Sequence, residues 1–278
     1  MVQRMDGNRF INPYLLNERR TLKDAIRWKM GGYADPKPLQ EPPEGFVYPA
    51  SPAPYDRNQP SAVWIGHSTY LIQTGEQTFL TDPVWSQYCS PIRFPVFKRL
   101  AQPPLALEHL PSIDVVLISH NHYDHLDKKT VLTLFRLQPD ILWVVPKKLA
   151  PWFHRLGIKS CVELSWWQRH GNITAVPAQH FSGRTLWDRD KTLWNGYVVE
   201  GEKTFYFAGD TGYNPFHFRE IGKKFSHLDL SLIPIGAYSP RAFMAPVHCN
   251  PQDSVQIHLD VGSRFSLGMH WKTFCLSE

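Results

Sequence analysis

Apolar runs separated by short polar breaks recur along the chain and predict many short strands and helices. The segment IDVVLIS at 113–119 is apolar and rich in β-branched residues, which indicates a strand buried on both faces. SAVWIGH and TYLIQTGEQTFLTDP, after residue 60, predict strands joined at Gly75-Glu76. Further strands are predicted at 142–146, 161–166, 173–180, 193–201, 203–210, 228–236 and 264–270. Helices are predicted at 127–137, 147–157, 215–225 and 251–262.

The first 60 residues differ from the rest of the chain in composition. They contain nine prolines, which exclude long regular elements. Within this stretch TLKDAIRWKM, at 21–30, predicts a short basic amphipathic helix. Packing of this arm on the protein's own core is the favoured interpretation, and membrane contact is the alternative. We therefore expect an N-terminal arm at 1–60 and one α/β domain at 61–278, with helices covering the outer faces of sheets.

Composition narrows the class of protein. Hydrophobic residues make up 42 % and charged residues 20 % of the chain, which is typical of a globular protein. The net charge of +5 suggests an anionic partner, such as a membrane surface, nucleic acid or a phosphate-bearing substrate, although scattered cations also fit a mildly basic surface. The four cysteines form no C-x-x-C pair, which disfavours a disulfide scaffold or zinc ribbon.

Neither a secretory leader nor a membrane span is expected. The start MVQRMDGNRF has no apolar core, and no 18 apolar residues run together. We therefore expect a cytoplasmic protein, with peripheral contact at the membrane as the alternative. No basic strip with interleaved aromatic residues is apparent, so no specific nucleic-acid partner is expected.

Donor side chains are concentrated in ISHNHYDHLD, directly after the strand predicted at 113–119. The spacing of His120 and His122 lets both point to one spot, while Asp124 and His125 follow a further turn and reach a neighbouring spot. Neutral imidazole and carboxylate are ligands that suit zinc. Left without metal, these groups would each need a partner in a half-buried turn, so a purely structural role is disfavoured.

Two metal ions would need more than four donors, and three more donor residues are the last residues of predicted strands. These are His180, Asp210 and His270. Taken alone, each would more often be a hydrogen-bonded core or surface residue than a ligand. With the cluster they form a plausible set of five histidines and two aspartates for a dinuclear site, in which a carboxylate bridges.

The spacing H-x-H-x-D-H, with single His, Asp and His residues at wide intervals, resembles the metallo-β-lactamase superfamily. Longer blocks narrow the match to the family of N-acylphosphatidylethanolamine-hydrolysing phospholipase D and its bacterial relatives. The blocks are WIGHSTYLIQ, FLTDPVWS, ISHNHYDHLD, ELSWW, PAQHFSGRTLWD, LWNGYVV, FYFAGDTGY, DLSLIPIGAY and MHWKTF, with RFINPY near the start. Together they span about 61–274, nearly all of the chain after the arm.

This resemblance implies an αββα sandwich of two mixed sheets, with two zinc ions at one edge and manganese or iron as alternatives. One ion would be held by His120, His122 and His180, and the other by Asp124, His125 and His270, with Asp210 bridging. The implied reaction cleaves a phospholipid phosphodiester to an N-acylethanolamine and phosphatidic acid by attack of a hydroxide held between the metals.

Candidate catalytic residues are Asp124, Asp210 and His248. His248, in APVHCNP, is expected to hydrogen-bond the substrate or leaving group, with a satisfied loop histidine as the alternative. Gln179 and Tyr123 are candidates for the pocket or for the surroundings of the ligands.

Two departures from the family pattern bear on activity. The sequence stops at FCLSE, soon after His270, and Lys272 stands where a glycine is usual. Because of these departures and the basic arm, a membrane-associated binding protein with a catalytically silent metal site stays open. A lactonase or other ester hydrolase stays open as well, because the same metal pair polarises a carbonyl as readily as a phosphoryl group. A homodimer is also left open.

Overall fold

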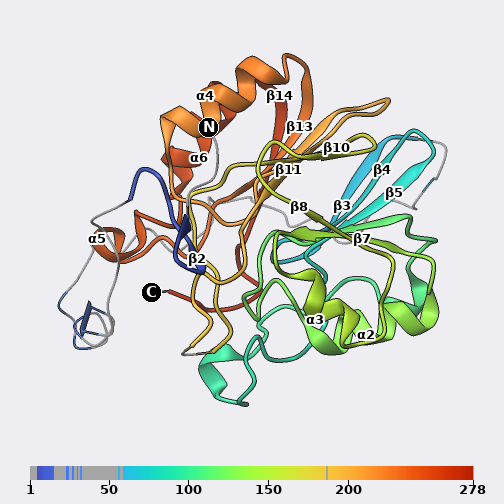
Figure 1. Ribbon diagram of the computed structural model, residues 1–278, viewed down its shortest axis with the longest axis horizontal. Helices are drawn as coiled ribbons and strands as arrows, with labels where there is room; N and C mark the ends of the chain where they lie inside the picture. The colour runs from blue at the N-terminus through green and yellow to red at the C-terminus, as the bar shows by residue number, and fades with distance from the viewer. Residues whose placement is uncertain are drawn as a thin grey trace, which may run out of the picture.

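Two six-stranded sheets pack face to face in the computed structural model, with helices against their outer faces (Figure 1). The structure describes residues 5–15, 23, 24, 27, 30, 32, 56, 59–185 and 187–277. This αββα arrangement confirms the predicted fold class. Both sheets are mixed, because each contains antiparallel and parallel pairs.

The first sheet has the order β3-β4-β5-β6-β7-β8. Its strands are β3 (Ser61–Gly66), β4 (Thr69–Thr74), β5 (Gln77–Thr81), β6 (Val115–Leu117), β7 (Leu142–Pro146) and β8 (Cys161–Leu164). The β3–β4–β5 pairs are antiparallel, and the pairs from β5 to β8 are parallel. Helices α2 (Lys128–Leu137) and α3 (Ala150–His154) cover its outer face. Asp127 is the N-cap of α2, and its side chain accepts a hydrogen bond from the Lys129 backbone NH.

The second sheet has the order β14-β13-β12-β11-β10-β9. Its strands are β9 (Arg169–His170), β10 (Ile173–Val176), β11 (Gly196–Val199), β12 (Phe205–Phe207), β13 (Leu228–Pro234) and β14 (Ser263–Met269). Helices α4 (Pro215–Lys224) and α6 (Pro251–Val261) cover its outer face. A capping box between Asn250 and Asp253 starts α6, and Gly262 ends it in the left-handed conformation.

Strand β6 contributes side chains to two different core clusters, one on each of its faces. Val115 and Leu117 lie in the core between the sheets, while Val116 lies in the core under α2 and α3. All three side chains are buried, which confirms the prediction of a strand buried on both faces. Burial of one such side chain stabilises the fold by about 1.5–3 kcal/mol. Phe79 and Phe205, whose ring centroids lie 5.4 Å apart, join the two sheets across this core.

Several strands are shorter than predicted at the edge where the donor residues lie. The strand predicted at 173–180 ends at Val176, because Pro177 has no NH for the ladder. The strand predicted at 203–210 spans only Phe205–Phe207. The donor residues after these strands therefore lie in loops. Short elements that the sequence pattern did not predict are β1 (Met5–Asp6), β2 (Arg9–Phe10), β9, α5 (Arg241–Met244) and the 3₁₀ turns η1 (Pro95–Phe97) and η2 (Leu107–His109).

The described part of the arm packs on the domain. Strands β1 (Met5–Asp6) and β2 (Arg9–Phe10) pair with each other, and the Phe10 NH donates to the Asp190 carbonyl over 2.7 Å. Tyr14 stacks on Phe216 at a centroid distance of 4.8 Å. Of the helix expected at 21–30, only residues 23, 24, 27 and 30 are described, and the first three of these are helical. The other residues of this expected helix lie outside the described ranges. The division of the chain at residue 60 therefore stays a prediction.

Transmembrane helices are absent from the part of the chain that the structure describes. No helix there has both the length and the apolar character needed to cross a bilayer.

Candidate metal centre

Loops from both sheets bring three histidines together at one edge of the sandwich. His120 and His122 follow β6, and His180 follows β10. The Nδ1 atom of His122 lies 2.8 Å from His120 Nε2 and 3.3 Å from His180 Nε2. We call His120, His122 and His180 the histidine group. Their three nitrogens point to one spot, as the spacing and the family resemblance predicted.

The second predicted set also converges. Asp124 Oδ2 lies 3.2 Å from His125 Nε2 and 3.3 Å from His270 Nε2. We call Asp124, His125 and His270 the mixed group. His270 comes directly after β14, so both sheets contribute to this group as well.

Asp210 lies where the two groups meet. Its Oδ2 atom is 3.0 Å from His270 Nε2 and 3.2 Å from His125 Nε2 in the mixed group. The same oxygen is 3.7 Å from His180 Nε2 in the histidine group. A carboxylate with contacts to both groups has the position required of a bridging ligand.

His248 also reaches this edge. Its Nδ1 atom lies 3.9 Å from Asp210 Oδ2, and its ring centroid is 5.1 Å from that of His180 and 5.4 Å from that of His270. The ring thus contacts both groups from one side and is partly exposed.

Two further site residues were missed by the sequence analysis. His67 follows β3, and its Nε2 lies 2.9 Å from Asp124 Oδ2. Asp82 follows β5 and accepts a hydrogen bond from His125 Nδ1 over 2.6 Å. Both residues follow predicted strands, which is the same signal that singled out His180. Such a carboxylate fixes the tautomer and orientation of the imidazole that it contacts.

The backbone at this edge is held in uncommon conformations. His67, Asp82 and His270 have φ angles of 54°, 31° and 59°, in a region that residues other than glycine rarely adopt. The His270 NH donates to the His67 carbonyl over 3.0 Å, and this bond ties the loops after β3 and β14 together. The surrounding hydrogen bonds therefore fix where these side chains project.

A close backbone approach sets the position of Asp210. The preceding residue, Gly209, has a φ of 61°, and a Cβ there would lie 2.7 Å from the Ser119 Cβ and 2.9 Å from the Asn195 carbonyl oxygen. A larger residue could not occupy this position without displacing the loop that carries His120.

Burial dominates the electrostatics of the histidine group. It lowers the pKa of His122 to about 4 and holds the pKa values of His120 and His180 well below the ordinary value for histidine. The pKa of His248 is also lowered to about 4, first by burial. These imidazoles are neutral at pH 7, which is the form that binds a metal ion.

Carboxylates reverse that effect in the mixed group. Burial by itself lowers the pKa of His270, but Asp210 and Asp124 outweigh it and raise this pKa to about 9. Burial likewise opposes protonation of His125, yet Asp210, Asp124 and Asp82 hold its pKa well above the ordinary value. The pKa values of Asp124 and Asp210 are held well below their usual range, because these histidines outweigh burial.

Several buried polar atoms at this edge have no hydrogen-bond partner among the described residues. They are His67 Nδ1, Asp210 Oδ1, His248 Nδ1 and His270 Nδ1. The Nε2 atoms of His125 and His270 have carboxylate oxygens within 3.3 Å but make no hydrogen bond of good geometry. Buried polar atoms are rarely left unpaired, since each costs about 1–3 kcal/mol. Coordination of cations would satisfy those that face the groups. The ligand-type atoms of each group also lie within 4.8 Å of one another. The residues therefore fit a dimetal site.

Gln179 and Tyr123 play different parts from each other. The Gln179 amide donates to the Pro246 carbonyl over 3.1 Å, and its oxygen accepts from Asn214, so it ties together the loops that carry His180 and His248. Tyr123 packs against Arg184, whose guanidinium lies 3.9 Å from the ring centroid.

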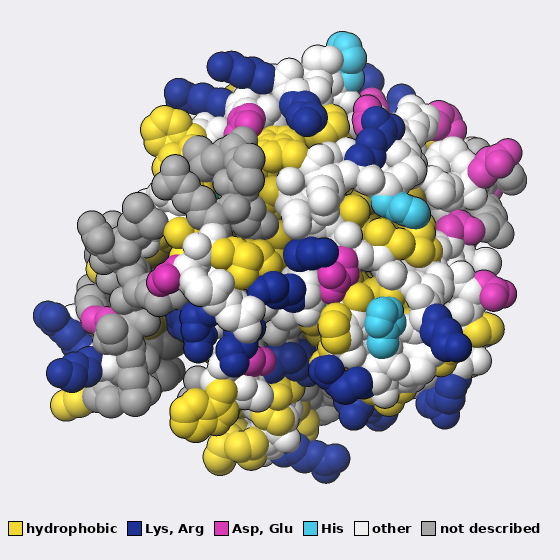
Figure 2. Space-filling view, in the orientation of Figure 1, with side chains coloured by type: hydrophobic (Ala, Val, Ile, Leu, Met, Phe, Trp, Pro, Cys, Tyr) yellow, Lys and Arg dark blue, Asp and Glu magenta, His cyan; other side chains and the backbone are white. Residues whose placement is uncertain are grey.

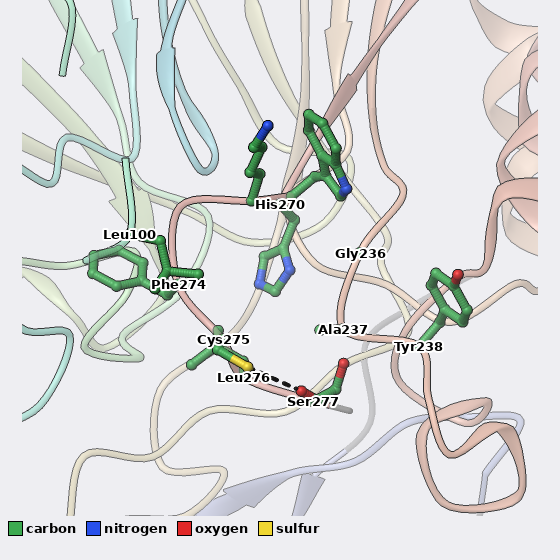
Figure 3. A pocket seen from close by; sticks show the side chains of 11 residues that line it. Leu100, Gly236, Ala237, Tyr238, His270, Phe274, Cys275, Leu276 and Ser277 are labelled. Carbon is green, nitrogen blue, oxygen red and sulfur yellow. Dashed lines mark hydrogen bonds between the residues drawn. The ribbon is translucent and has the colours of Figure 1, made fainter. Parts of the chain in front are cut away.

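A cavity of about 260 Å³ opens beside the mixed group. Figure 3 shows the His270 imidazole in the middle of its lining, with Leu100 and Phe274 on one side and Tyr238 on the other. The cavity joins apolar walls to a side chain of the candidate metal site, as binding sites for small molecules commonly do.

Sequence comparisons identify a family and relatives of this chain. A family model described as a beta-lactamase superfamily domain matches residues 77–271. The N-acyl-phosphatidylethanolamine-hydrolyzing phospholipase D 1 of Caenorhabditis elegans is 42 % identical over 77 % of this chain and 64 % of its own length. The mitochondrial enzyme of that name from Saccharomyces cerevisiae is 37 % identical over 77 % of this chain and 48 % of its own length. The chain thus spans less than two thirds of the length of these curated relatives.

Among solved structures, Igni18, a metallo hydrolase from Ignicoccus hospitalis, superposes with a TM-score of 0.60 at 19 % identity, over 77 % of this chain and 83 % of that one. This similarity supports the fold alone. The family model spans more than half of the chain and contains all seven predicted metal ligands. The chain is therefore a member of the metallo-β-lactamase superfamily, and its sequence is similar to the N-acylphosphatidylethanolamine-hydrolysing phospholipase D family within it.

Proposed function

We propose that this protein is a dinuclear zinc-dependent hydrolase, and that it cleaves the phosphodiester of N-acylphosphatidylethanolamine or a related phospholipid. The observation that carries the proposal is the position of Asp210, which contacts both the histidine group and the mixed group. The printed names of the C. elegans and yeast relatives supply the substrate class.

Each group would hold one cation. The histidine group would take one ion through three neutral imidazoles, and the mixed group would take the other through Asp124, His125 and His270. Two zinc ions held there would supply Lewis acidity, which makes a nucleophile from water near neutral pH and neutralises charge on phosphoryl oxygens.

The protein's own residues would position the reacting groups. Asp210 Oδ1, buried without a hydrogen-bond partner among the described residues, would orient the attacking water. Asp124 would keep its place through His67, which donates to its Oδ2 atom. His248, neutral at pH 7, would hydrogen-bond the substrate or the departing oxygen, because it is partly exposed beside both groups.

The test is a metal analysis coupled to a substrate panel. The purified protein would be stripped with a chelator, reloaded with zinc, manganese or iron, and assayed with N-acylphosphatidylethanolamine, bis-p-nitrophenyl phosphate and a lactone. We expect two metal ions per chain and hydrolysis of both phosphodiesters, lost on chelation and restored by zinc.

Other outcomes separate the alternative functions. Hydrolysis of the lactone alone would show an ester hydrolase instead of a phosphodiesterase, since a bound metal pair polarises a carbonyl as well as a phosphoryl group. Two bound metals with no turnover of any substrate would make the site catalytically silent and contradict the proposal.

A further inference from the structure

A loop beside the candidate metal centre holds large apolar side chains out in solvent. The 90–100 loop runs from Ser90 to Leu100 and includes η1. Its side chains Ile92, Phe94, Val96 and Leu100 are exposed by 59, 54, 52 and 66 %. Figure 2 shows hydrophobic side chains gathered at the lower end of the view, where the teal η1 lies in Figure 1. Apolar patches of this kind mark interaction surfaces.

The apolar side chains are exposed on a loop whose base is fixed to the domain by hydrogen bonds. The Cys89 NH donates to the Phe97 carbonyl over 3.1 Å, and the Leu100 NH donates to the Thr273 carbonyl over 2.8 Å. The buried guanidinium of Arg99 donates to the Val84 carbonyl over 2.6 Å. Phe97 packs inward against the core at the base. These contacts hold the base of the loop on the domain while the side chains of its tip lie in solvent.

Cations accompany the apolar tip. Arg93 and Lys98 are exposed on the loop, and the sequence from 83 to 107 contains no Asp or Glu. Within the described ranges, no carboxylate lies within ion-pair distance of either side chain. The surface thus combines apolar and positive side chains, a combination that suits the anionic face of a bilayer.

The two ends of the loop line different cavities. Leu100, at its end, lines the cavity that contains His270. Ser90, at its start, lines a second cavity of about 620 Å³. Lys128, Lys129 and Arg184 also line this second cavity, together with one carboxylate, Asp127, so the lining is positive overall.

We propose that the 90–100 loop docks this protein on an anionic lipid surface. Ile92, Phe94 and Val96 enter the boundary between headgroups and acyl chains, while Arg93 and Lys98 contact lipid phosphates. This inference deepens the proposed function and rests on it in one respect, namely that the substrate is a lipid. Docking in this orientation brings lipid next to the cavity beside His270.

Charge favours a bilayer over a second copy of the chain as the occupant. The chain carries a net charge of +5, so two copies meeting at a patch that is itself positive would repel each other. An anionic bilayer has the complementary charge, and each nearby Lys or Arg strengthens such attachment about fivefold.

The test measures binding of the full chain to vesicles by co-sedimentation. The probes are vesicles of phosphatidylcholine alone and of phosphatidylcholine with phosphatidylglycerol. We expect the triple variant Ile92→Ser, Phe94→Ser, Val96→Ser to bind the anionic vesicles at least about tenfold more weakly than the wild type. The pair Arg93→Gln, Lys98→Gln should lose affinity only for the anionic vesicles.

A matched control removes exposed apolar side chains elsewhere. Val255 and Leu259 are exposed by 61 and 63 % on α6, at the other end of the molecule in Figure 1, and Val255→Ser, Leu259→Ser should bind vesicles like the wild type. If the triple variant is poorly folded by thermal melting, the single variant Phe94→Ser, which changes one exposed side chain, serves in its place.

The outcomes for docking and for catalysis are separable. Loss of vesicle binding with unchanged hydrolysis of water-soluble bis-p-nitrophenyl phosphate supports docking through the loop. Vesicle binding through the loop without hydrolysis of any diester keeps the docking surface and removes the proposed function. Undiminished vesicle binding by the loop variants, or a wild-type dimer that the triple variant dissociates, overturns the docking proposal.

Discussion

The histidine group and the mixed group share one edge of the sandwich but differ in charge. In the histidine group burial keeps three imidazoles neutral, whereas in the mixed group buried carboxylates hold protons on His125 and His270. The histidine group can therefore bind a cation without losing protons, whereas the mixed group must first release the protons on His125 and His270. Similar side chains at one site can thus respond differently to pH, because their neighbours differ.

Asp210→Ala removes the contact that the two groups share and should have the largest effect. We expect turnover to fall by more than about 100-fold, since loss of a residue that only supports a ligand already costs about 10–100-fold. Metal content per chain, measured by mass spectrometry of the elements, should fall for both sites. Asp140→Ala, at an exposed carboxylate on the surface, is the matched control and should change neither quantity.

His122→Ala breaks the histidine group alone. Turnover should again fall by more than about 100-fold, but the mixed group should keep its ion because its own donors remain. The measurement is the number of metal ions per chain together with the rate. His154→Ala, at an exposed histidine on α3, is the control. Full activity of His122→Ala would remove this residue from the ligand set.

A pH series should separate the groups without any mutation. Between about pH 6.5 and pH 9, the affinity of the mixed group for zinc should rise roughly tenfold per pH unit for each proton displaced, since the pKa of His270 is raised to about 9. The histidine group should show little change there, because the pKa of His122 is about 4. Calorimetry in two buffers of different ionisation enthalpy counts the protons, and about two should leave at pH 7.

The same raised pKa sets a stability trend for the metal-free protein. Protonated His270 stabilises the fold against the unfolded chain, whose histidine pKa is the ordinary 6.5. That contribution is fully present below about pH 6.5 and is lost as pH rises through about 9. Identical melting temperatures of the metal-free protein at pH 6.5 and 9 would contradict this assignment.

Asp82→Asn should weaken the mixed group by about 10–100-fold in metal affinity, because it removes the carboxylate that accepts from His125 Nδ1. In the histidine group the corresponding partner of His180 is the Val247 backbone carbonyl, at 2.9 Å, which no side-chain substitution removes. Zinc titration of the variant is the measurement. Asp229→Asn, where a carboxylate accepts from the Thr204 NH far from the site, controls for a general loss of stability.

His67→Gln should have the smallest effect, about tenfold or less in metal affinity of the mixed group. Burial lowers the pKa of His67 to about 3, so its neutral ring donates to Asp124 as a positioning residue, and the glutamine amide can still donate. If His67 were itself a ligand, the loss would match that of His122→Ala, with one ion missing per chain.

The sequence predicted the layers of the fold well and their edges less well. The apolar run at 113–119 identified a central strand, because a strand that is buried on both faces shows no alternation of polar and apolar residues. The strands before His180 and Asp210 were predicted too long. The first ends at Val176 because Pro177 cannot donate to the ladder, and the second ends at Phe207, before Gly209 turns the chain in the left-handed conformation. His67 and Asp82 also lie at the ends of predicted strands, but they were missed because the sequence does not indicate that the ends of β3 and β5 lie beside the H-x-H-x-D-H segment.

The sequence by itself determined the superfamily and the candidate ligands, since H-x-H-x-D-H crowds donors within six positions and its spacing is a local property of the chain. Only the tertiary structure showed that His67 and Asp82 join them, that Asp210 contacts both groups, and that the two groups carry opposite pKa shifts. These features depend on distances between loops far apart in sequence and on burial, and both are fixed by the packing of one sheet on the other.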